Sequence, residues 1–215
     1  MESGAHSATM ETGWGGGAAP FGASWQKTMM WIFIVTDALL FSGLLCGYAF
    51  LRQANSAPWP DRTEVFSIPF IALMTFILIT SSATMGSAVT AARLGDMKKA
   101  LMYVSMTIVG GAAFLSCQAY EWSHLIHEGA RLTGPIAGSE LIEKGVTSQF
   151  TQAFFVLTGF HGSHVLSGLV ILLITAIRTS MGKTPPQGVE MAGLYWHFVD
   201  LVWVFIFTLF YLLPS

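Results

Sequence analysis

Five long apolar stretches alternate with short polar breaks along this chain. They cover residues 28–51, 66–92, 100–121, 149–177 and 191–213. Each stretch offers the about 20 predominantly apolar residues that a helix needs to cross the hydrocarbon core of a bilayer. The pattern therefore predicts an all-α integral membrane bundle of five transmembrane helices, contained in residues 27–215.

The first 26 residues do not follow this pattern. They contain no Lys or Arg, have no apolar core, and are rich in Gly, Ala and Ser. This composition is typical of a flexible tail and unlike a cleavable targeting signal. We therefore expect a flexible N-terminal tail over residues 1–26, and we expect the helices themselves to direct the chain to the membrane.

The overall composition supports a membrane protein. Hydrophobic residues make up 53% of the 215 residues and charged residues only 10%, whereas a soluble domain carries about 25% charged residues. The net charge of −2 gives no reason to expect a nucleic-acid partner. Cys46 and Cys117 both lie inside apolar stretches, where a cysteine commonly acts as a small hydrophobic residue. They predict neither a disulfide nor a metal site.

The basic residues of the polar breaks predict the orientation, because loops rich in Lys and Arg stay on the cytoplasmic side. One side carries six basic residues and the other carries four. The first set is Lys27, Arg93, Lys98, Lys99, Arg178 and Lys183, and the second set is Arg52, Arg62, Arg131 and Lys144. The N-terminus is therefore expected in the cytoplasm and the C-terminus on the periplasmic side.

Several ionisable residues interrupt the apolar spans. Each costs at least about 2.5–3.5 kcal/mol to insert, so such residues usually face the interior of a bundle and have a partner there. A helical rise of about 1.5 Å per residue places four of them in one layer around the inner half and middle of the membrane. These four are Asp37, His164, His197 and Asp200, while His161 shares a helix face with His164 and Glu121 lies near the outer end of the third span.

Two interpretations of these residues stay open. In the first, they form hydrogen bonds between helices, each worth about 0.6–2 kcal/mol. In the second, they handle protons, because sets of Asp, Glu and His within a membrane often mark proton pathways.

The possible metal ligands of the spans do not make up a complete ligand set. Glu121 and His124 form one Glu-x-x-His element, whereas a di-iron bundle needs two such elements and two further glutamates. A haem would have to pair His164 with His197 on facing helices. We predict no metal site and no catalytic residue in this chain. A self-contained haem or di-iron oxidoreductase, and a small transporter that relays protons through Asp37 and Asp200, stay as alternatives.

Four stretches, taken in their order, resemble subunit III of the haem-copper terminal oxidases. They are IVTDALLFSG in the first span, QAYEW at the end of the third, FFVLTGFHGSHVLSG in the fourth and YWHFVDLVW in the fifth. The resemblance covers residues 25–213 and identifies a member of the five-helix bacterial type. Longer members have seven helices, and this chain begins where their third helix would, so the lipid cleft of the family must be formed differently here or closed by a neighbouring subunit.

The resemblance implies a role in aerobic respiration. Subunit III is a non-redox subunit of the enzyme that reduces oxygen to water and moves protons across the bacterial inner membrane. It packs mainly against subunit I, with subunit II also in the complex, and haem and copper are expected in those partners and not in this chain. Bound phospholipid in a cleft is expected to support proton uptake and oxygen access. The residues of the last two motifs favour the cytochrome c type, and a quinol oxidase is the alternative.

The resemblance also assigns roles to individual residues. Asp37 matches the intramembrane carboxylate of the family, which is Glu in many relatives, and is assigned a proton-related role. Phe33 matches an aromatic residue of the lipid cleft, while Lys27 and Arg178 are placed to meet lipid phosphates. The motif residues Glu121, His161, His164, His197 and Asp200 are assigned to an intramembrane polar framework.

Overall fold

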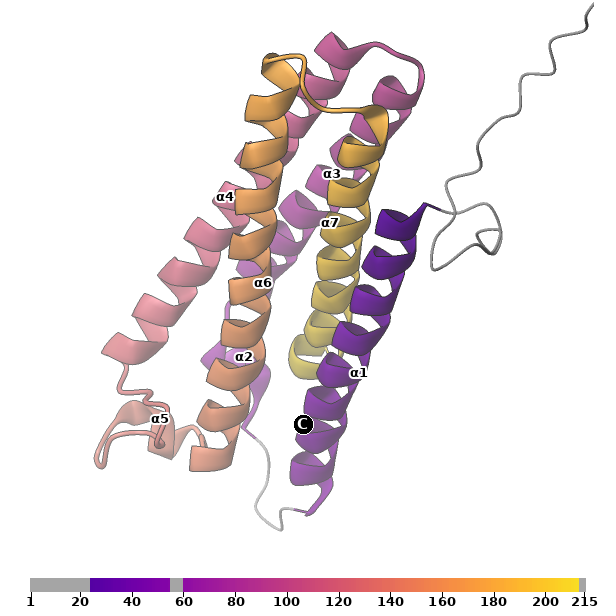
Figure 1. The fold of residues 1–215 in the computed structure, drawn as a ribbon. Coiled ribbons are helices and arrows are strands. Elements are labelled where there is room, and N and C mark those ends of the chain that lie inside the picture. Colours follow the sequence, from indigo (N-terminus) through magenta and orange to yellow (C-terminus); the bar gives the residue numbers. More distant parts are fainter. Residues whose placement is uncertain (1–23, 55–59, 213–215) are drawn as a thin grey trace, which may run out of the picture.

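The computed structural model describes residues 24–54 and 60–212, and all regular elements of these residues are helical (Figure 1). The five long helices are α1 (Trp25–Ala54), α3 (Ile68–Arg93), α4 (Met97–His127), α6 (Ser148–Ser180) and α7 (Pro186–Ile206). The chain continues from α7 into the π-helical segment η2 (Phe207–Leu212), and two single turns, α2 (Arg62–Val65) and α5 (Glu140–Glu143), lie in connections. The five long helices are each long and apolar enough to cross a membrane, which confirms the predicted five-helix membrane bundle.

The helices extend beyond the apolar stretches that predicted them. Helix α4 continues to His127, and α7 already begins at Pro186. Polar residues at these ends stay helical because a helix satisfies its own backbone hydrogen bonds where it leaves the hydrocarbon. Of the tail predicted for residues 1–26, residues 1–23 lie outside the described residues, whereas Trp25 and Gln26 belong to the first turn of α1.

Helices α3, α4, α6 and α7 form a four-helix bundle, and α1 lies against its side (Figure 1). Within the bundle, α3 packs on α4 and α7, and α6 packs on α4 and α7. Helix α1 contacts α7 and, to a smaller extent, α6. The start of α1, the α3–α4 connection and the α6–α7 connection lie at the same end, which we call the basic end because it carries Lys27, Arg93, Lys98, Lys99, Arg178 and Lys183.

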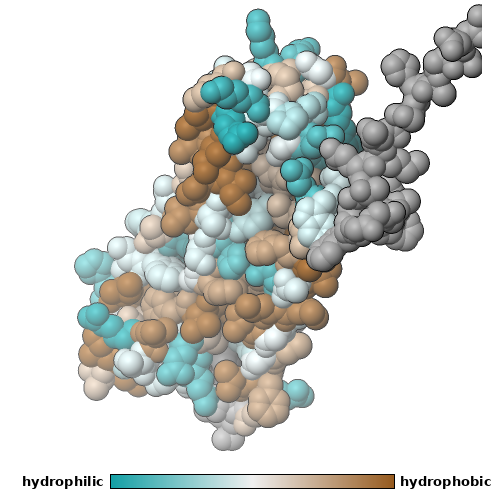
Figure 2. Space-filling model, in the orientation of Figure 1, coloured by the Kyte–Doolittle hydropathy of each residue, from teal (hydrophilic) through white to brown (hydrophobic). Residues whose placement is uncertain are grey.

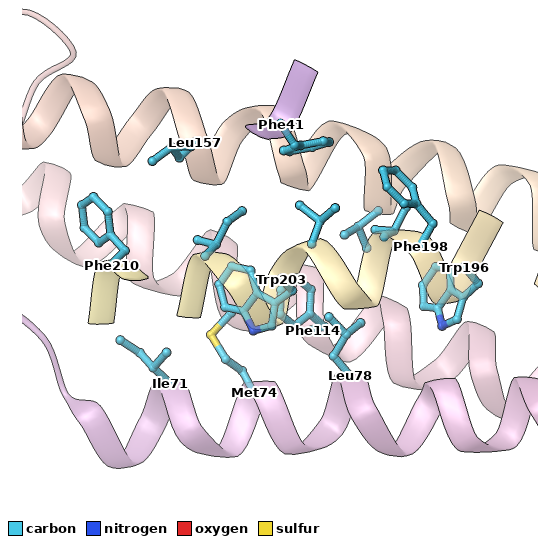
Figure 3. Close-up of a cluster of buried hydrophobic side chains, with 14 of the residues drawn as sticks. Phe41, Ile71, Met74, Leu78, Phe114, Leu157, Trp196, Phe198, Trp203 and Phe210 are labelled. Atoms are coloured by element: carbon cyan, nitrogen blue, oxygen red, sulfur yellow. The ribbon is translucent and has the colours of Figure 1, made fainter. Parts of the chain in front are cut away.

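Two tryptophans of α7 occupy the centre of the bundle (Figure 3). The indole N–H of Trp203 donates to Thr75 Oγ1 of α3 at 3.0 Å, and its ring meets the Phe114 ring edge-on at 4.8 Å. The indole N–H of Trp196 donates to Ser81 Oγ at 3.2 Å. Each ring thus finds the acceptor that a buried indole requires while it fills the space between helices.

Close approach of the helices depends on glycine beside Trp196. A methyl group added at Gly111 of α4 would overlap the Trp196 ring, and one added at Gly168 of α6 would lie 3.0 Å from it. Small residues allow helices to approach closely in lipid, where van der Waals contact replaces the hydrophobic effect as the main attraction between them. Trp196 and these glycines therefore set the distances from α7 to α4 and α6.

The surface of this bundle matches a membrane environment. In Figure 2, hydrophobic side chains cover much of the visible face, and hydrophilic ones gather at the basic end and around the connections at the opposite end. At the basic end, Asp96 caps α4 by accepting a hydrogen bond from the backbone N–H of Lys99 at 3.1 Å. The Lys99 ammonium, 3.0 Å from Asp96 Oδ2, and then this backbone bond lower the pKa of the Asp96 carboxyl below its ordinary value.

Candidate functional site

A buried acid–base pair joins α1 to α6. Asp37 Oδ1 lies 3.3 Å from His164 Nε2, and His164 Nδ1 lies 2.8 Å from the backbone oxygen of Phe160. A carbonyl oxygen only accepts, so Nδ1 carries a hydrogen and donates it there. Nε2 is therefore the nitrogen that faces the Asp37 carboxyl group. Asp37 and His164 form one acid–base unit between α1 and α6.

The surroundings of this unit are apolar. The ring of Phe41 lies 5.1 Å from the His164 ring, and the Phe160 ring lies 4.7 Å from it. Asp37 Oδ2 is buried and has no hydrogen-bond partner among the described residues. Separated charges are costly in such an environment unless they are closely paired. The close contact with His164 therefore offsets part of the cost of burying the Asp37 carboxyl group, and one of its oxygens stays without a hydrogen-bond donor among the described residues.

A cavity of about 810 Å³ lies between α1, α6 and α7, next to the acid–base pair. Phe33, one turn before Asp37, lines it together with Tyr195, and their ring centroids are 6.0 Å apart. The Tyr195 hydroxyl lies 2.6 Å from Ser167 Oγ and donates to the backbone oxygen of His164 at 3.2 Å. The remaining lining includes Met29, Met30, Ile171, Thr175, Arg178 and Met191. We call this space the α1 cavity; it is apolar along most of its wall and carries a cationic side chain.

Two of the three residues assigned to lipid binding line the α1 cavity, namely Phe33 and Arg178. The third, Lys27, takes part in an ion pair instead. Its Nζ lies 2.6 Å from Glu190 Oε1, and Arg93 Nη2 lies 3.0 Å from the same oxygen. This group joins the start of α1 to α7 and α3. The acidic Glu190 at the basic end of the chain is the sequence signal that could have indicated this pair.

Two further histidines of the expected polar framework contact neighbouring helices. His161 is fully buried, and its Nε2–H donates to the backbone oxygen of Val199 in α7 at 3.1 Å. His197 Nδ1 lies 2.6 Å from Ser82 Oγ, which joins α7 to α3. Asp200 Oδ1 is buried with no hydrogen-bond partner among the described residues. His197 thus turns toward a hydroxyl of α3.

Glu121 is the framework residue at the opposite end of the bundle. Its side chain is buried, and the Tyr211 hydroxyl lies 3.4 Å from both carboxyl oxygens. The contact joins α4 to η2. Sequence reasoning did not identify Tyr211, Ser82 or Tyr195 as partners, because residues with hydroxyl groups occur in every span and only the rotation of each helix selects among them.

The possible metal ligands do not come together. No group of three or more His, Cys, Asp and Glu side chains that could hold a metal ion occurs within residues 24–54 and 60–212. His164 meets α1, whereas His197 meets α3. His124 Nδ1 lies 3.5 Å from Glu128, whereas Glu121 contacts the Tyr211 hydroxyl.

Comparison with known proteins adds the decisive observation. The family model described as "Cytochrome c oxidase subunit III" matches residues 6–215. The chain belongs to this family. It is therefore a subunit of a haem-copper terminal oxidase, a membrane-bound oxidoreductase complex with several subunits.

Curated members of the subunit III family are similar over most of their length. The chain is 35% identical to cytochrome c oxidase subunit 3 of Bacillus sp. strain PS3, covering 85% of this chain and 83% of that protein. It is 38% identical to quinol oxidase subunit 3 of Bacillus subtilis, covering 85% and 84%. It is 34% identical to cytochrome bo(3) ubiquinol oxidase subunit 3 of Pseudomonas aeruginosa, covering 86% and 83%. The subunit III relatives therefore include oxidases named for both electron donors.

Proposed function

We propose that this chain is the non-redox accessory subunit of a proton-pumping oxidase of the bacterial inner membrane. It packs mainly against subunit I, with subunit II also in the complex, and those partners hold the haem and copper. The basic end faces the cytoplasm, in keeping with the rule for Lys and Arg in loops. The observation that supports this proposal is the 3.3 Å contact between Asp37 Oδ1 and His164 Nε2, an acid–base unit beside the α1 cavity.

The acid–base pair supports proton uptake in this proposal. A proton enters from the cytoplasmic side, is shared between the carboxyl group and the imidazole, and leaves toward subunit I. Aspartate is shorter than the glutamate of many relatives, and His164 on α6 meets it directly at 3.3 Å. The imidazole thus supplies the second proton-binding group within reach of the shorter acid.

Asp37→Asn in the complete oxidase tests the proton role. The amide keeps the shape and can donate to His164, but it cannot exchange a proton with it. We expect slower proton uptake or a shorter active lifetime during turnover, with normal assembly. Glu143→Gln, an exposed acid in α5, is the matched control and should leave both measurements unchanged. An Asp37→Asn oxidase with the pH profile and lifetime of the unchanged enzyme would refute the proton role.

Phospholipid is the proposed occupant of the α1 cavity. Its volume of about 810 Å³ lies within the range of known ligand pockets, which is about 300–1,000 Å³. Acyl chains fit the Met, Phe and Ile lining, and the Arg178 guanidinium is suited to a lipid phosphate. The same acyl chains offer oxygen, an apolar gas, a path toward subunit I.

Lipid retention tests this occupant. Phe33→Ala and Arg178→Gln should each reduce the phospholipid that stays bound to the purified complex, as measured by mass spectrometry. Lys183→Gln removes an exposed cation of the same end that does not line the cavity. Equal lipid loss in the Lys183 control and the two cavity variants would show that general surface charge, and not the cavity, holds the lipid.

Cytochrome c is the proposed electron donor, because the motifs YWHFVD and FHGSHV of the last two spans resemble those of the cytochrome c type. Quinol is the second candidate, because relatives named as quinol oxidases are as similar to this chain as those named for cytochrome c. Oxygen consumption by the purified oxidase with reduced cytochrome c, compared with a quinol, decides between them. Stoichiometric iron in the isolated subunit would contradict the accessory role and support a self-contained haem or di-iron oxidoreductase.

A further inference from the structure

A second cavity, of about 260 Å³, lies at the end opposite the basic end, between the start of α3 and the last turns of α4. Glu121 contributes to its wall, and we therefore call it the Glu121 cavity. It is separate from the α1 cavity, since none of its lining residues comes from α1, α6 or α7. The lining includes Phe66, Phe70, Tyr120, Glu121 and His124.

The carboxyl group of Glu121 has too few partners for its degree of burial. The residue is only 6% exposed, and its one polar side-chain contact among the described residues is the Tyr211 hydroxyl, at 3.4 Å from each oxygen. A hydroxyl has a single proton, so it can satisfy only one of these oxygens well. None of the ion pairs among the described residues includes Glu121. Because a buried acid that lacks partners is costly, a donor or a positive charge entering the cavity would stabilise it.

Aromatic rings make up much of the remaining wall. Phe66 lies against Tyr211, with ring centroids 5.0 Å apart, and Phe70 meets the Tyr120 ring edge-on at 5.7 Å. The faces of such rings attract cations, and an acid beside aromatic rings is the usual setting for an organic ammonium group. A metal ion fits less well, because Zn²⁺ and Ca²⁺ need four or more ligands, whereas the cavity offers one carboxyl group and one imidazole.

The cavity lies at the depth of lipid headgroups. Glu121 is six residues before the end of α4, which corresponds to about 9 Å along the helix. Tyr120 is 64% exposed and His124 is exposed beside it, as expected for residues at a membrane–water interface. A ligand from the bilayer can therefore reach the cavity sideways.

We propose that the Glu121 cavity binds the protonated amine of a phosphatidylethanolamine-type lipid. The ammonium group donates to the Glu121 carboxylate and lies against the rings of Phe66, Phe70 and Tyr120. His124 at the rim is placed to donate to the phosphate of the same lipid. The site requires an amine, so it discriminates between lipids, whereas the Arg178 side chain of the α1 cavity selects only for a phosphate.

The test compares lipids with equal chains and different headgroups. The complete oxidase is placed in phosphatidylglycerol nanodiscs and titrated with short-chain phosphatidylethanolamine, short-chain phosphatidylglycerol or ethylammonium chloride. Bound lipid is counted by native mass spectrometry, and thermal stability is followed in parallel. We expect phosphatidylethanolamine to bind and to raise the melting temperature, and added phosphatidylglycerol to do neither.

Variants of the cavity wall test whether phosphatidylethanolamine binds in the Glu121 cavity. Glu121→Gln still accepts a hydrogen bond from Tyr211 but removes the charge, and should weaken phosphatidylethanolamine binding about tenfold, which corresponds to about 1.4 kcal/mol. Tyr120→Leu removes an exposed ring without touching the acid and should weaken binding about threefold, because a cation–π contact at an exposed site is worth about 0.5–1 kcal/mol. Glu143→Gln is the control and should bind as the unchanged oxidase does.

Three outcomes would overturn the proposal. Phosphatidylethanolamine binding that Glu121→Gln leaves unchanged would place the lipid elsewhere. Equal binding of both lipids would show that no amine is recognised. Ethylammonium binding that depends on Glu121, without lipid binding, would show a free amine as the ligand. Proton uptake and the lipid of the α1 cavity do not involve Glu121, so they are expected to stay normal in every arm, and this proposal can fail without theirs.

Discussion

Helices α7 and α1 both cross the membrane, but they are attached to the rest of the molecule in different ways. Half of the apolar window of α7 is buried, compared with 6% for α1. Helix α7 is fixed by shape, through Trp196 against Gly111 and Trp203 against Phe114. Helix α1 presents a mostly lipid-facing surface and approaches the bundle through contacts spaced along its length.

Beside the apolar contacts of Phe41 and Tyr48, helix α1 makes three polar contacts that are spaced along its length. Lys27 meets Glu190 at the basic end, Asp37 meets His164 near the middle, and the Tyr48 hydroxyl lies 3.3 Å from the backbone oxygen of Leu209 toward the other end. A hydrogen bond between membrane helices is worth about 0.6 kcal/mol on average, so such contacts hold a helix loosely compared with interlocking side chains. The bundle therefore supplies most of the buried packing, and α1 forms the less buried wall of the α1 cavity.

Gly111→Val should give the largest effect, because it acts on the interlocked side of this comparison. The added side chain overlaps the Trp196 ring, and overpacking of this kind costs about 1–3 kcal/mol. We expect earlier unfolding of the purified subunit in a detergent titration followed by Trp fluorescence. Gly43→Val in α1 is the control, because a Cβ there meets no atom within 4 Å. Equal destabilisation by the two variants would show that the bundle is not held by shape.

Asp37→Leu should give an intermediate effect that is confined to α1. It leaves the imidazole of His164 without its buried partner, which costs about 1–3 kcal/mol before relaxation. Because α1 contributes little to the core, the loss should appear as a wider distribution of spin-label distances between α1 and α6, with unchanged unfolding of the bundle. Asp37→Leu, His164→Leu and the double variant form a double-mutant cycle in the free energy with which α1 packs on α6, as obtained from the spin-label distances. The coupling energy between the two side chains should reach about 0.5 kcal/mol or more. Zero coupling would mean that the two side chains do not hold α1 together.

The sequence predicts where the helices lie along the chain and how deep their residues lie in the membrane. Apolar stretches of about 20 residues have a single common solution in a bilayer, so the five helices follow directly from the pattern. The helical rise then places Asp37 and His164 at one depth, and the structure brings them together at 3.3 Å. The length of each helix and the depth of its residues in the membrane can therefore be predicted from one sequence, since both depend on the spacing of residues along a helix.

The rotation of each helix is not readable in this way. His197 and Asp200 share a helix face, yet His197 is satisfied by Ser82 of α3, one of many hydroxyl groups in the spans. The position of Trp196 against Gly111 decides this rotation, and it depends on the partner helix. Likewise, η2 is π-helical, which changes the direction of Tyr211 and brings it to Glu121. Residues 207–212 contain neither Pro nor Gly, so the local sequence does not predict the change from α-helix to π-helix.

Glu190→Gln should give the smallest effect and concerns the weakest attachment of α1. It removes the charge that Lys27 and Arg93 share at distances of 2.6 and 3.0 Å. Both cations are partly exposed, and such ion pairs are worth about 0–1 kcal/mol and weaken with salt over a Debye length of about 10 Å at 0.1 M. We expect faster motion of a spin label near the start of α1 at low salt, and no difference from the unchanged protein at high salt. Asp96→Asn is the matched control, because Asp96 pairs with Lys99 inside the α3–α4 region and does not touch α1. A label that responds equally to both substitutions would show that net charge at the basic end, and not the Lys27–Glu190 contact, positions the start of α1. Asp37 would then be the acidic residue whose contact holds α1 beside the α1 cavity.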